Sequence, residues 1–400
     1  MNILNITAQK PHSTGSGVYL TEIVKEFDTM GFSQSVIGGV YKEDVVTFPD
    51  KVEFIPVYFQ STELPFPIVG MSDEMPYEST LYNQMTKQMI KKFAQVFMSV
   101  IEKTVETFRP DLILCHHLYL LTAIVRERFP DLQVAAICHG TDIRQMKKHM
   151  LADSYIKEQM KKLNKIFALH EIQKLEIERI YEVDESRIKI IGSGYNPEIF
   201  RRQEIQKNRH EINLIYAGKL TQKKGVISLI QALDYIKDFE PPIVLNLAGG
   251  YGNEEEYNQI YRLAGKAAYK IKFLGKLNQA QLAQEFNRCD VFILPSFYEG
   301  LPLVLMEALA CGLKVITTDL PGIREWMDCN IPNNAIIYVT PPPIENADEP
   351  KLESLPQFEE SLARAIIEAV NQNTNHLADL QNASWESVCK KIIITENCNE

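Results

Sequence analysis

Two glutamates, Glu299 and Glu307, lie on either side of a glycine-proline turn in the second half of the chain. An apolar run typical of a buried strand precedes the turn. An apolar helical pattern follows it and stops at Gly312, a residue type that commonly ends helices. Pro302 is predicted at the first helical position. Because the first amides of a helix lack internal partners and the helix dipole is positive there, this turn is predicted to bind phosphate.

The helix after this turn also carries a candidate ribose-binding group. Glu307 lies four residues after Leu303, so it shares a helix face with the free amides of Leu303 and Val304. Its carboxylate can accept hydrogen bonds from both hydroxyls of a ribose. A nucleotide is therefore the predicted ligand, and Gly300 and Leu301 belong to the same turn.

Two lysines follow the first predicted strand of the second half, at residues 212–216. Lys219 and Lys224 stand where cations can face a pyrophosphate and neutralise the charge that builds as a nucleotide leaves. Lys223 is a further candidate for this role. The alternative is that all three are ordinary surface lysines beside the start of a helix.

A histidine follows an apolar strand of the first half, predicted at residues 133–138. Ligands of parallel α/β sheets bind at the carboxyl ends of the strands, so His139 is predicted to point toward a ligand, with Asp142 nearby. A satisfied structural histidine is the alternative. The pair His116 and His117 follows another predicted strand, and core packing and ligand contact are equally good interpretations of it.

A short glycine-rich loop, Gly15-Ser16-Gly17, separates the first predicted strand from the first helix. Glycines there let a ligand approach the backbone closely. A dinucleotide-binding loop is disfavoured, because Leu20 occupies its third glycine position and the second strand ends without an acid for a ribose. An oxidoreductase is therefore not predicted.

An α/β fold with parallel sheets and crossover helices is predicted to position these residues. Short β-branched runs alternate with amphipathic stretches from end to end. The 400 residues, 45% of them hydrophobic, are enough for two cores. Turn residues followed by a charged stretch place the boundary near residue 200, giving Rossmann-like domains at 1–200 and 201–375.

Composition excludes several other classes of protein. A formal net charge of −10 argues against nucleic-acid binding. Seven cysteines without a CxxC pair indicate reduced thiols, not disulfides or a zinc framework. No Asp-x-Asp triplet occurs, so neither a metal site of that kind nor a cofactor is predicted. With no signal sequence or long apolar segment, a cytoplasmic protein is expected.

The motifs together resemble glycosyltransferase family 4, the retaining enzymes of the GT-B fold whose signature is two glutamates with seven residues between them. The resemblance extends over most of the chain. It implies two Rossmann-like domains facing each other across a cleft, with a C-terminal helix within 376–400 that packs back on the first domain. It also implies a metal-independent transfer from a nucleotide diphosphate sugar, with a UDP-sugar favoured.

The resemblance also implies a role for each matching residue. Glu307 would bind the ribose, Glu299 would approach the hydroxyls of the donor sugar, and His139 would contact that sugar. The family usually has arginine where Lys219 stands, and lysine cannot bind a phosphate in the same bidentate way. The predicted site is catalytic His139, Glu299 and Lys224; donor-binding Lys219, Lys224, Gly300, Leu301, Leu303, Val304, Glu307 and Gly17; and acceptor-side Gly15, Ser16 and Asp142, without metal ligands.

The partners expected from this resemblance are a nucleotide sugar and a hydroxyl acceptor on a sugar, a lipid-linked molecule or a small molecule. A hexose or N-acetylhexosamine would be moved, as in polysaccharide or glycolipid synthesis. The irregular segment 64–77 is a specificity loop or a structural cover. The cations of first-half helices form a solvated face or a peripheral membrane contact. They are Lys87, Lys91, Lys92, Arg144, Lys147, Lys148, Lys157, Lys161, Lys162 and Lys165.

Two other functions remain as alternatives. One is a non-catalytic partner subunit that keeps the fold and serves another transferase. The other is a sugar-nucleotide epimerase with a similar two-domain fold. Consumption of an added acceptor distinguishes a transferase from an epimerase, and nucleotide release distinguishes an enzyme from a non-catalytic subunit.

Overall fold

A computed structural model describes residues 1–73, 75–148, 151–205, 210–346, 348–372 and 378–396. It has two compact units, unit 1 from Met1 to Ser193 together with the chain from Trp385 onward, and unit 2 from Gly194 to Ser384. The first boundary falls before residue 200 because Phe200 is fully buried in unit 2, with its ring 6.2 Å from that of Phe286. The predicted α/β class is confirmed.

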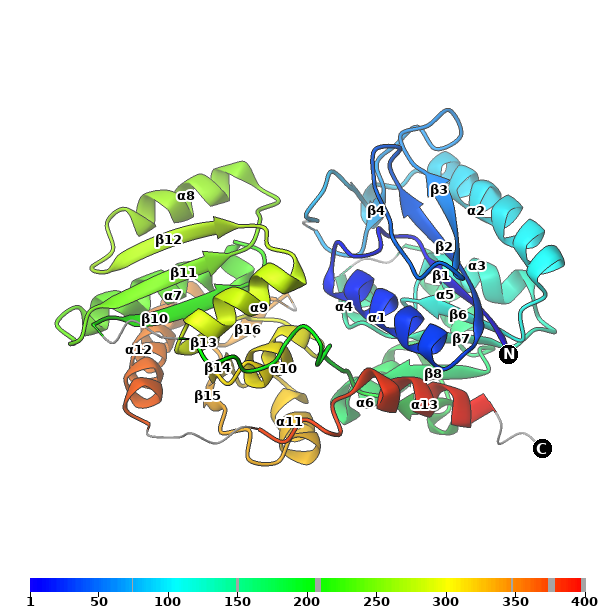
Figure 1. Cartoon of the computed structure of the whole chain (residues 1–400). Coiled ribbons are helices and arrows are strands. Elements are labelled where there is room, and N and C mark those ends of the chain that lie inside the picture. The colour runs from blue at the N-terminus through cyan, green and yellow to red at the C-terminus, as the bar shows by residue number, and fades with distance from the viewer. Residues whose placement is uncertain (74, 149–150, 206–209, 347, 373–377, 397–400) are drawn as a thin grey trace. The chain divides into compact units, whose positions relative to one another are not determined.

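Unit 1 is built on a seven-stranded parallel sheet with the order β3-β2-β1-β6-β7-β8-β9 (Figure 1). The strand order reverses between β1 and β6, which is where ligands bind in open α/β sheets. The strands are β1 (Asn2–Thr7), β2 (Ser33–Val40), β3 (Glu53–Tyr58), β6 (Leu112–His116), β7 (Val134–Ile137), β8 (Lys165–Ala168) and β9 (Ile188–Ile190), with a separate pair β4 (Val69–Gly70) and β5 (Thr80–Leu81).

Helices lie on both sides of this sheet in Figure 1. The last of them comes from the C-terminus and packs on the first, with the ring of Trp385 4.9 Å from that of Tyr19 and the Cys389 thiol 3.7 Å from the Ile23 carbonyl. The helices are α1 (Gly15–Thr29), α2 (Lys87–Phe108), α3 (Leu120–Arg128), α4 (Thr141–Lys148), α5 (Asp153–Met160), α6 (Glu171–Tyr181) and α13 (Trp385–Glu396).

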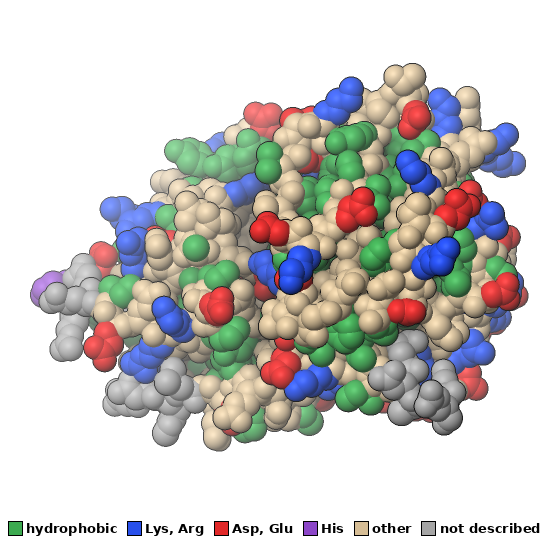
Figure 2. Space-filling view, turned by 45° about the vertical axis from the view of Figure 1, so that its right-hand side comes forward, with side chains coloured by type: hydrophobic (Ala, Val, Ile, Leu, Met, Phe, Trp, Pro, Cys, Tyr) green, Lys and Arg blue, Asp and Glu red, His purple; other side chains and the backbone are tan. Residues whose placement is uncertain are grey.

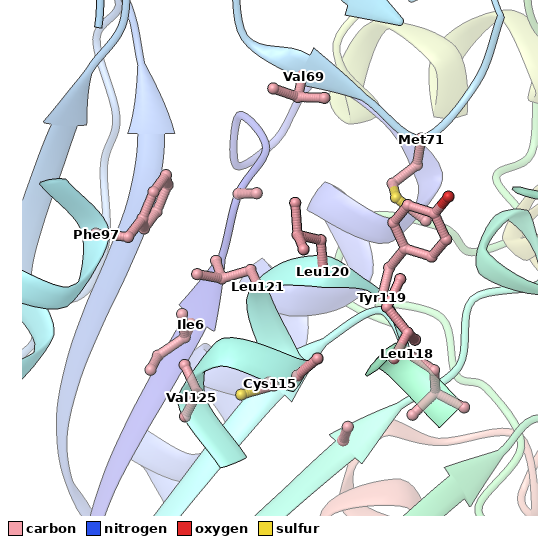
Figure 3. Packing of buried hydrophobic residues seen from close by; sticks show 14 of the residues in the cluster. Ile6, Val69, Met71, Phe97, Cys115, Leu118, Tyr119, Leu120, Leu121 and Val125 are labelled. Atoms are coloured by element: carbon pink, nitrogen blue, oxygen red, sulfur yellow. The ribbon is translucent and has the colours of Figure 1, made fainter. Parts of the chain in front are cut away.

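The irregular segment 64–77 belongs largely to the core of unit 1. Leu64, Ile68 and Val69 are completely buried, and Met71 is nearly so. Figure 3 shows Met71 beside Tyr119, within the cluster that also contains the strand residues of the sheet. These contacts make the segment a cover for the core, which favours the structural interpretation over the specificity loop.

Unit 2 has a six-stranded parallel sheet with the order β12-β11-β10-β13-β14-β15. The order reverses between β10 and β13, so the loops after these strands lie at a ligand-binding position. The strands are β10 (Ile212–Ala217), β11 (Ile243–Ala248), β12 (Lys270–Gly275), β13 (Val291–Leu294), β14 (Lys314–Thr318) and β15 (Ile337–Val339). The helices are α7 (Val226–Ala232), α8 (Glu254–Ala264), α9 (Gln279–Arg288), α10 (Leu303–Ala310), α11 (Ile323–Asn330) and α12 (Leu355–Asn371).

Acidic partners contact half of the ten candidate membrane-binding cations of unit 1. Arg144 and Lys148 both pair with Asp73, and Lys147 pairs with Glu176. Lys157 and Lys161 likewise contact carboxylates. Basic and acidic side chains are interspersed on the face shown in Figure 2. The structure therefore does not support the alternative of a peripheral membrane contact, and no helix among the described residues is long and apolar enough to span a bilayer.

Candidate functional site

The turn between β13 and α10 leads into the helix close to where the sequence predicted. Pro302 is the N-cap and not the first helical residue, because its ψ of 117° is extended, and the helix begins at Leu303. Leu303 and Val304 therefore occupy the first two helical positions, whose amides have no acceptor within the helix. Gly312 follows the helix with a φ of 79°, which confirms the predicted helix end.

Glu307 lies one turn into α10 and is only 7% exposed. Leu301 is also buried, so only its backbone can face a ligand, whereas Gly300 is half-buried. Burial, together with the charge of Glu307, raises the pKa of the Cys311 thiol to about 12. The thiol is therefore neutral near pH 7 and is not a nucleophile there.

Lys224 and Glu299 are brought together by the parallel pairing of β10 and β13. Lys224 ends a short 3-10 turn after β10, and Glu299 lies in the loop after β13. The Lys224 ammonium donates to Glu299 Oε1 at 2.7 Å, and the two side chains are 24% and 14% exposed. A cation and a carboxylate thus stand side by side at the edge where the strand order reverses.

The other two lysines of this loop are placed differently from Lys224. The Lys223 ammonium lies 3.1 Å from the buried carboxylate of Asp348, so it pairs with a different acid from Lys224. Lys219 is half-buried, and its carbonyl accepts a hydrogen bond from the Tyr216 hydroxyl at 2.5 Å. Burial, and then the charge of Glu299, raises the pKa of that hydroxyl, so it stays a donor.

Three closely packed glycines, Gly218, Gly249 and Gly250, lie at the same sheet edge and were not predicted from the sequence. A Cβ on Gly249 would lie 1.7 Å from the carbonyl oxygen of Gly218, and one on Gly218 would lie 2.6 Å from the Tyr216 hydroxyl. The Gly250 carbonyl accepts from the Leu220 amide at 2.9 Å. The adjacent Gly249 and Gly250 after an apolar strand were the available signal, since paired glycines there allow close approach of backbones.

Gly225 fixes where α7 begins, and its replacement by alanine is expected to destabilise unit 2. Its φ is 70°, and a Cβ would lie 2.0 Å from the Pro295 carbonyl oxygen. A left-handed alanine alone costs about 1–2 kcal/mol, and the contact adds to it, so we expect Gly225→Ala to lower the free energy of unfolding by at least about 2 kcal/mol. Urea unfolding measures the loss. Gly15→Ala is the control, because a Cβ there meets no atom within 4 Å. An equal loss of unfolding free energy in both variants would contradict the prediction.

His139 in unit 1 lies in a group of aromatic rings. Its Nε2 is 3.1 Å from His116 Nδ1, and the two imidazoles are stacked with an interplanar angle of 11°. The rings of His117 and Tyr19 lie 4.8 and 5.2 Å from it. Burial, and then the neighbouring imidazoles, lowers the pKa of His139 well below its usual value. His139 is therefore a neutral imidazole, half-buried, at the carboxyl end of β7.

His116 and His117 are both buried at the end of β6. Burial lowers the pKa of His116 to about 3, with a smaller contribution from His117. His117 has a φ of 77°, and both of its ring nitrogens are buried without a hydrogen-bond partner. Such backbone strain and unpaired polar atoms gather at functional sites. Burial of the two rings fits core packing, and their unpaired nitrogens fit a place beside a ligand, so both interpretations of the pair stay open.

Asp142 has a structural role, which corrects its prediction as an acceptor-side residue. It is completely buried, and its carboxylate accepts from the backbone amides of Leu118 at 2.9 Å and of His139 and Ile143 at 3.2 Å. The Cys138 thiol also lies 3.2 Å from it. With its oxygens occupied by the chain and hidden from solvent, Asp142 holds the loops after β6 and β7 and cannot meet an acceptor.

The glycine-rich loop forms the first turn of α1. Thr14 is the N-cap, and its hydroxyl accepts from the Gly17 amide at 3.1 Å. A Cβ on Gly17 would lie 2.7 Å from the Lys10 carbonyl oxygen, so this glycine is needed for packing. Its amide is already used, which argues against a donor contact by Gly17. Gly15 is exposed and Ser16 half-buried, and both remain accessible at the helix start.

Among the residues that the structure describes, no three His, Cys, Asp or Glu side chains gather so that they could hold a metal ion. The site in unit 2 thus consists of Lys219, Lys224, Glu299, Gly300, Glu307 and the amides of Leu303 and Val304. The site in unit 1 consists of His139 with His116 and His117.

Comparison with known protein families covers most of the chain. Residues 198–348 match the model described as glycosyl transferases group 1, and residues 13–199 match that of glycosyltransferase family 4. The amylovoran biosynthesis glycosyltransferase AmsK of Erwinia amylovora is 26% identical over 255 residues, which are 58% of this chain and 59% of that protein. A glycogen synthase of Mycobacterium tuberculosis is 24% identical over 56% of this chain and 55% of its own length.

Solved structures share the fold over the whole chain. Sucrose-phosphate synthase from Thermosynechococcus elongatus matches with a TM-score of 0.70 at 16% identity, covering 100% of this chain and 98% of that one. HepE from Anabaena, in complex with UDP and glucose, matches with a TM-score of 0.68 at 15% identity and 99% of both chains. The two curated relatives above, in contrast, are matched over less than two thirds of their own lengths.

Proposed function

We propose that this chain, which belongs to the group 1 glycosyltransferases of the GT-B fold, transfers a sugar from a nucleotide diphosphate donor with retention of anomeric configuration. The observation that carries the proposal is the ion pair of Lys224 and Glu299 at the reversal of strand order in unit 2. It places a cation for the departing phosphate beside a carboxylate for the hydroxyls of the sugar.

Unit 2 would hold the nucleotide through groups that already lie in position. The first amides of α10 and its dipole attract the phosphates, and Glu307, one turn further on, accepts from the ribose hydroxyls. Lys224 and Lys219 neutralise the negative charge that develops on the leaving group. In this proposal unit 1 contributes His139, which contacts the donor sugar as a neutral imidazole.

The proposed reaction needs no covalent intermediate with the protein. The acceptor oxygen bonds to the anomeric carbon on the face from which the nucleoside diphosphate departs. The bond from that carbon to the phosphate oxygen breaks, and its electron pair leaves with the phosphate, which takes the proton of the acceptor hydroxyl. The protein stabilises charge and orients the reactants. Lysines and a helix N-terminus replace a divalent metal in this role.

We favour a UDP-sugar as the donor and a hexose or N-acetylhexosamine as the transferred group. HepE from Anabaena was solved with UDP and glucose, and AmsK is named for amylovoran biosynthesis. These relatives support a uridine donor and an acceptor that belongs to a polysaccharide or glycolipid. The acceptor itself would be a hydroxyl of a sugar, a lipid-linked molecule or a small molecule.

The proposal is tested by nucleoside diphosphate release from UDP-, GDP- and ADP-sugars in buffer with chelator and no added metal. Water serves as the acceptor, so no natural acceptor is required. We expect release from one of these donors, and Glu307→Ala should reduce it about 100-fold. The matched control is Glu359→Ala, which removes another buried acid of unit 2 that is hydrogen-bonded to Ser228 at 3.1 Å.

The outcomes separate the proposal from its alternatives. Release that needs an added divalent cation would contradict the metal-independent mechanism. Binding of a sugar nucleotide without release, and without acceptor consumption, would favour a non-catalytic subunit. Conversion of the sugar nucleotide to an epimer would favour an epimerase. An equal loss in Glu307→Ala and Glu359→Ala would show that the effect of Glu307 is structural.

A further inference from the structure

The contact between His116 and His139 restricts where the protons of both rings lie. His116 Nδ1 and His139 Nε2 are 3.1 Å apart, so one of these nitrogens donates to the other. Each neutral imidazole carries one N–H and one bare nitrogen. The position of the shared proton therefore decides which atom of His139 carries the other proton, and with it whether His139 offers a donor or an acceptor to a ligand.

The surroundings of His116 favour one of the two arrangements. Its other nitrogen, Nε2, is buried without a hydrogen-bond partner. If His139 were the donor, His116 would have to carry its proton on this Nε2, leaving a buried N–H unpaired. If His116 donates through Nδ1, only a bare lone pair is left there. Unpaired buried N–H groups are rarer in proteins than unpaired acceptors, so the second arrangement is preferred.

We propose that His116 is a positioning residue that donates its Nδ1–H to His139 Nε2, and thereby fixes His139 with its proton on Nδ1. His139 then presents a hydrogen-bond donor to the oxygen of a bound hydroxyl. This inference rests on the proposed function only in taking that hydroxyl to belong to the donor sugar. The two rings are nearly parallel, with an interplanar angle of 11° and centroids 5.3 Å apart, which suits a hydrogen bond between their edges.

The other neighbours of His139 are compatible with this arrangement. Tyr19 contacts it edge-on, and its hydroxyl donates to the Gly192 carbonyl at 2.9 Å, so it does not compete for the imidazole. His117 lies ring to ring at 4.8 Å and has no hydrogen-bond partner for either nitrogen. Asp142 accepts from the His139 backbone amide, not from its ring. In the described part of the chain, His139 Nδ1 has no hydrogen-bond partner and is open to a ligand.

The protonated nitrogen can be identified by NMR without any ligand. The chain has only eight histidines, so selective ¹⁵N-histidine labelling gives few imidazole signals, and His139→Gln assigns those of His139. The test compares wild type, His116→Asn and His116→Leu at neutral pH. Asparagine places an amide N–H near the original Nδ1 and keeps the donor, whereas leucine removes it. A thermal melt of each variant checks that unit 1 is folded.

We expect His139 to carry its proton on Nδ1 in wild type and in His116→Asn, and to show Nε2–H in His116→Leu. Hydrolysis of the preferred sugar nucleotide should fall about tenfold in kcat in His116→Leu, as when the partner that orients a functional histidine is lost. His116→Asn should recover most of that loss. KM for the donor should change less than kcat, because the nucleotide is held by unit 2.

Two results would overturn the proposed hydrogen bond. One is a wild-type His139 that carries its proton on Nε2, and the other is a His139 tautomer that does not respond to His116→Leu. A tautomer that responds while kcat does not would overturn the positioning role in the transfer and remove His139 from the proposed donor contact. If no sugar nucleotide is hydrolysed at all, the proposed function fails, but the NMR result still decides the hydrogen bond.

Discussion

Lys224→Ala is expected to slow nucleoside diphosphate release from the preferred sugar nucleotide by about 100-fold. Its ammonium comes from the 3-10 turn after β10 and lies 2.7 Å from Glu299, in the loop that leads to α10, where the departing phosphate is proposed to lie. Alanine removes the charge that stabilises the leaving group and leaves Glu299 without this cation. Initial rates at saturating donor, without metal, measure the loss in kcat.

Lys223→Ala is the matched control for this experiment, because it removes the same charge one residue earlier in the chain. Its ammonium lies 3.1 Å from Asp348, so the loss should affect stability more than turnover, and we expect the rate to remain within about twofold of wild type. A loss in Lys223→Ala as large as in Lys224→Ala would contradict the assignment and return Lys223 to the phosphate site.

The site in unit 2 could be predicted from sequence because each of its parts is local. A strand, a glycine-proline turn and an apolar helix place Glu299, the amides of Leu303 and Val304, and Glu307 within one short segment. Lys224 comes from another segment, but it too follows a strand directly. Since all carboxyl ends of a parallel sheet share one edge, two such loops meet whenever their strands are neighbours.

The partner of each lysine could not be predicted in the same way. Lys223 and Lys224 are adjacent in the chain, yet one contacts Asp348 and the other Glu299. The choice depends on the direction of each side chain in the 3-10 turn that Gly225 ends. The three packed glycines were not predicted for a related reason. Only the packing of two loops against each other shows that Gly249 has no room for a Cβ beside Gly218.

In unit 1, the sequence placed His139 correctly after a buried strand, but it did not show that Asp142 is buried. His139 and Asp142 both follow β7, and a loop beyond a parallel strand suggests ligand contact for every polar residue in it. Which of them is exposed depends on the segment around Leu118, 24 residues earlier in the chain, whose amide donates to the Asp142 carboxylate. Burial of this kind depends on tertiary contacts, which the spacing of residues along the chain does not predict.

Asp142→Ala is expected to lower the free energy of unfolding of unit 1 by about 4 kcal/mol. The change removes a completely buried carboxylate and leaves the amides of Leu118, His139 and Ile143 without their acceptor. The reporter is Trp385, one of only two tryptophans, which packs on Tyr19 in unit 1. In a Trp326→Phe background, its fluorescence follows the urea unfolding of this unit alone.

Asp142→Asn is the control, because it keeps the shape and one acceptor oxygen. Its loss should be smaller, about 1–2 kcal/mol, since one oxygen can still serve Leu118 and His139 while the new amide group meets a donor. Hydrogen exchange of peptides from the loops after β6 and β7 should be faster in Asp142→Ala than in Asp142→Asn. A carboxylate that holds two loops together cannot be removed without loss of stability. If both variants unfolded at the wild-type urea concentration and lost only sugar transfer, Asp142 would therefore be an acceptor-binding residue.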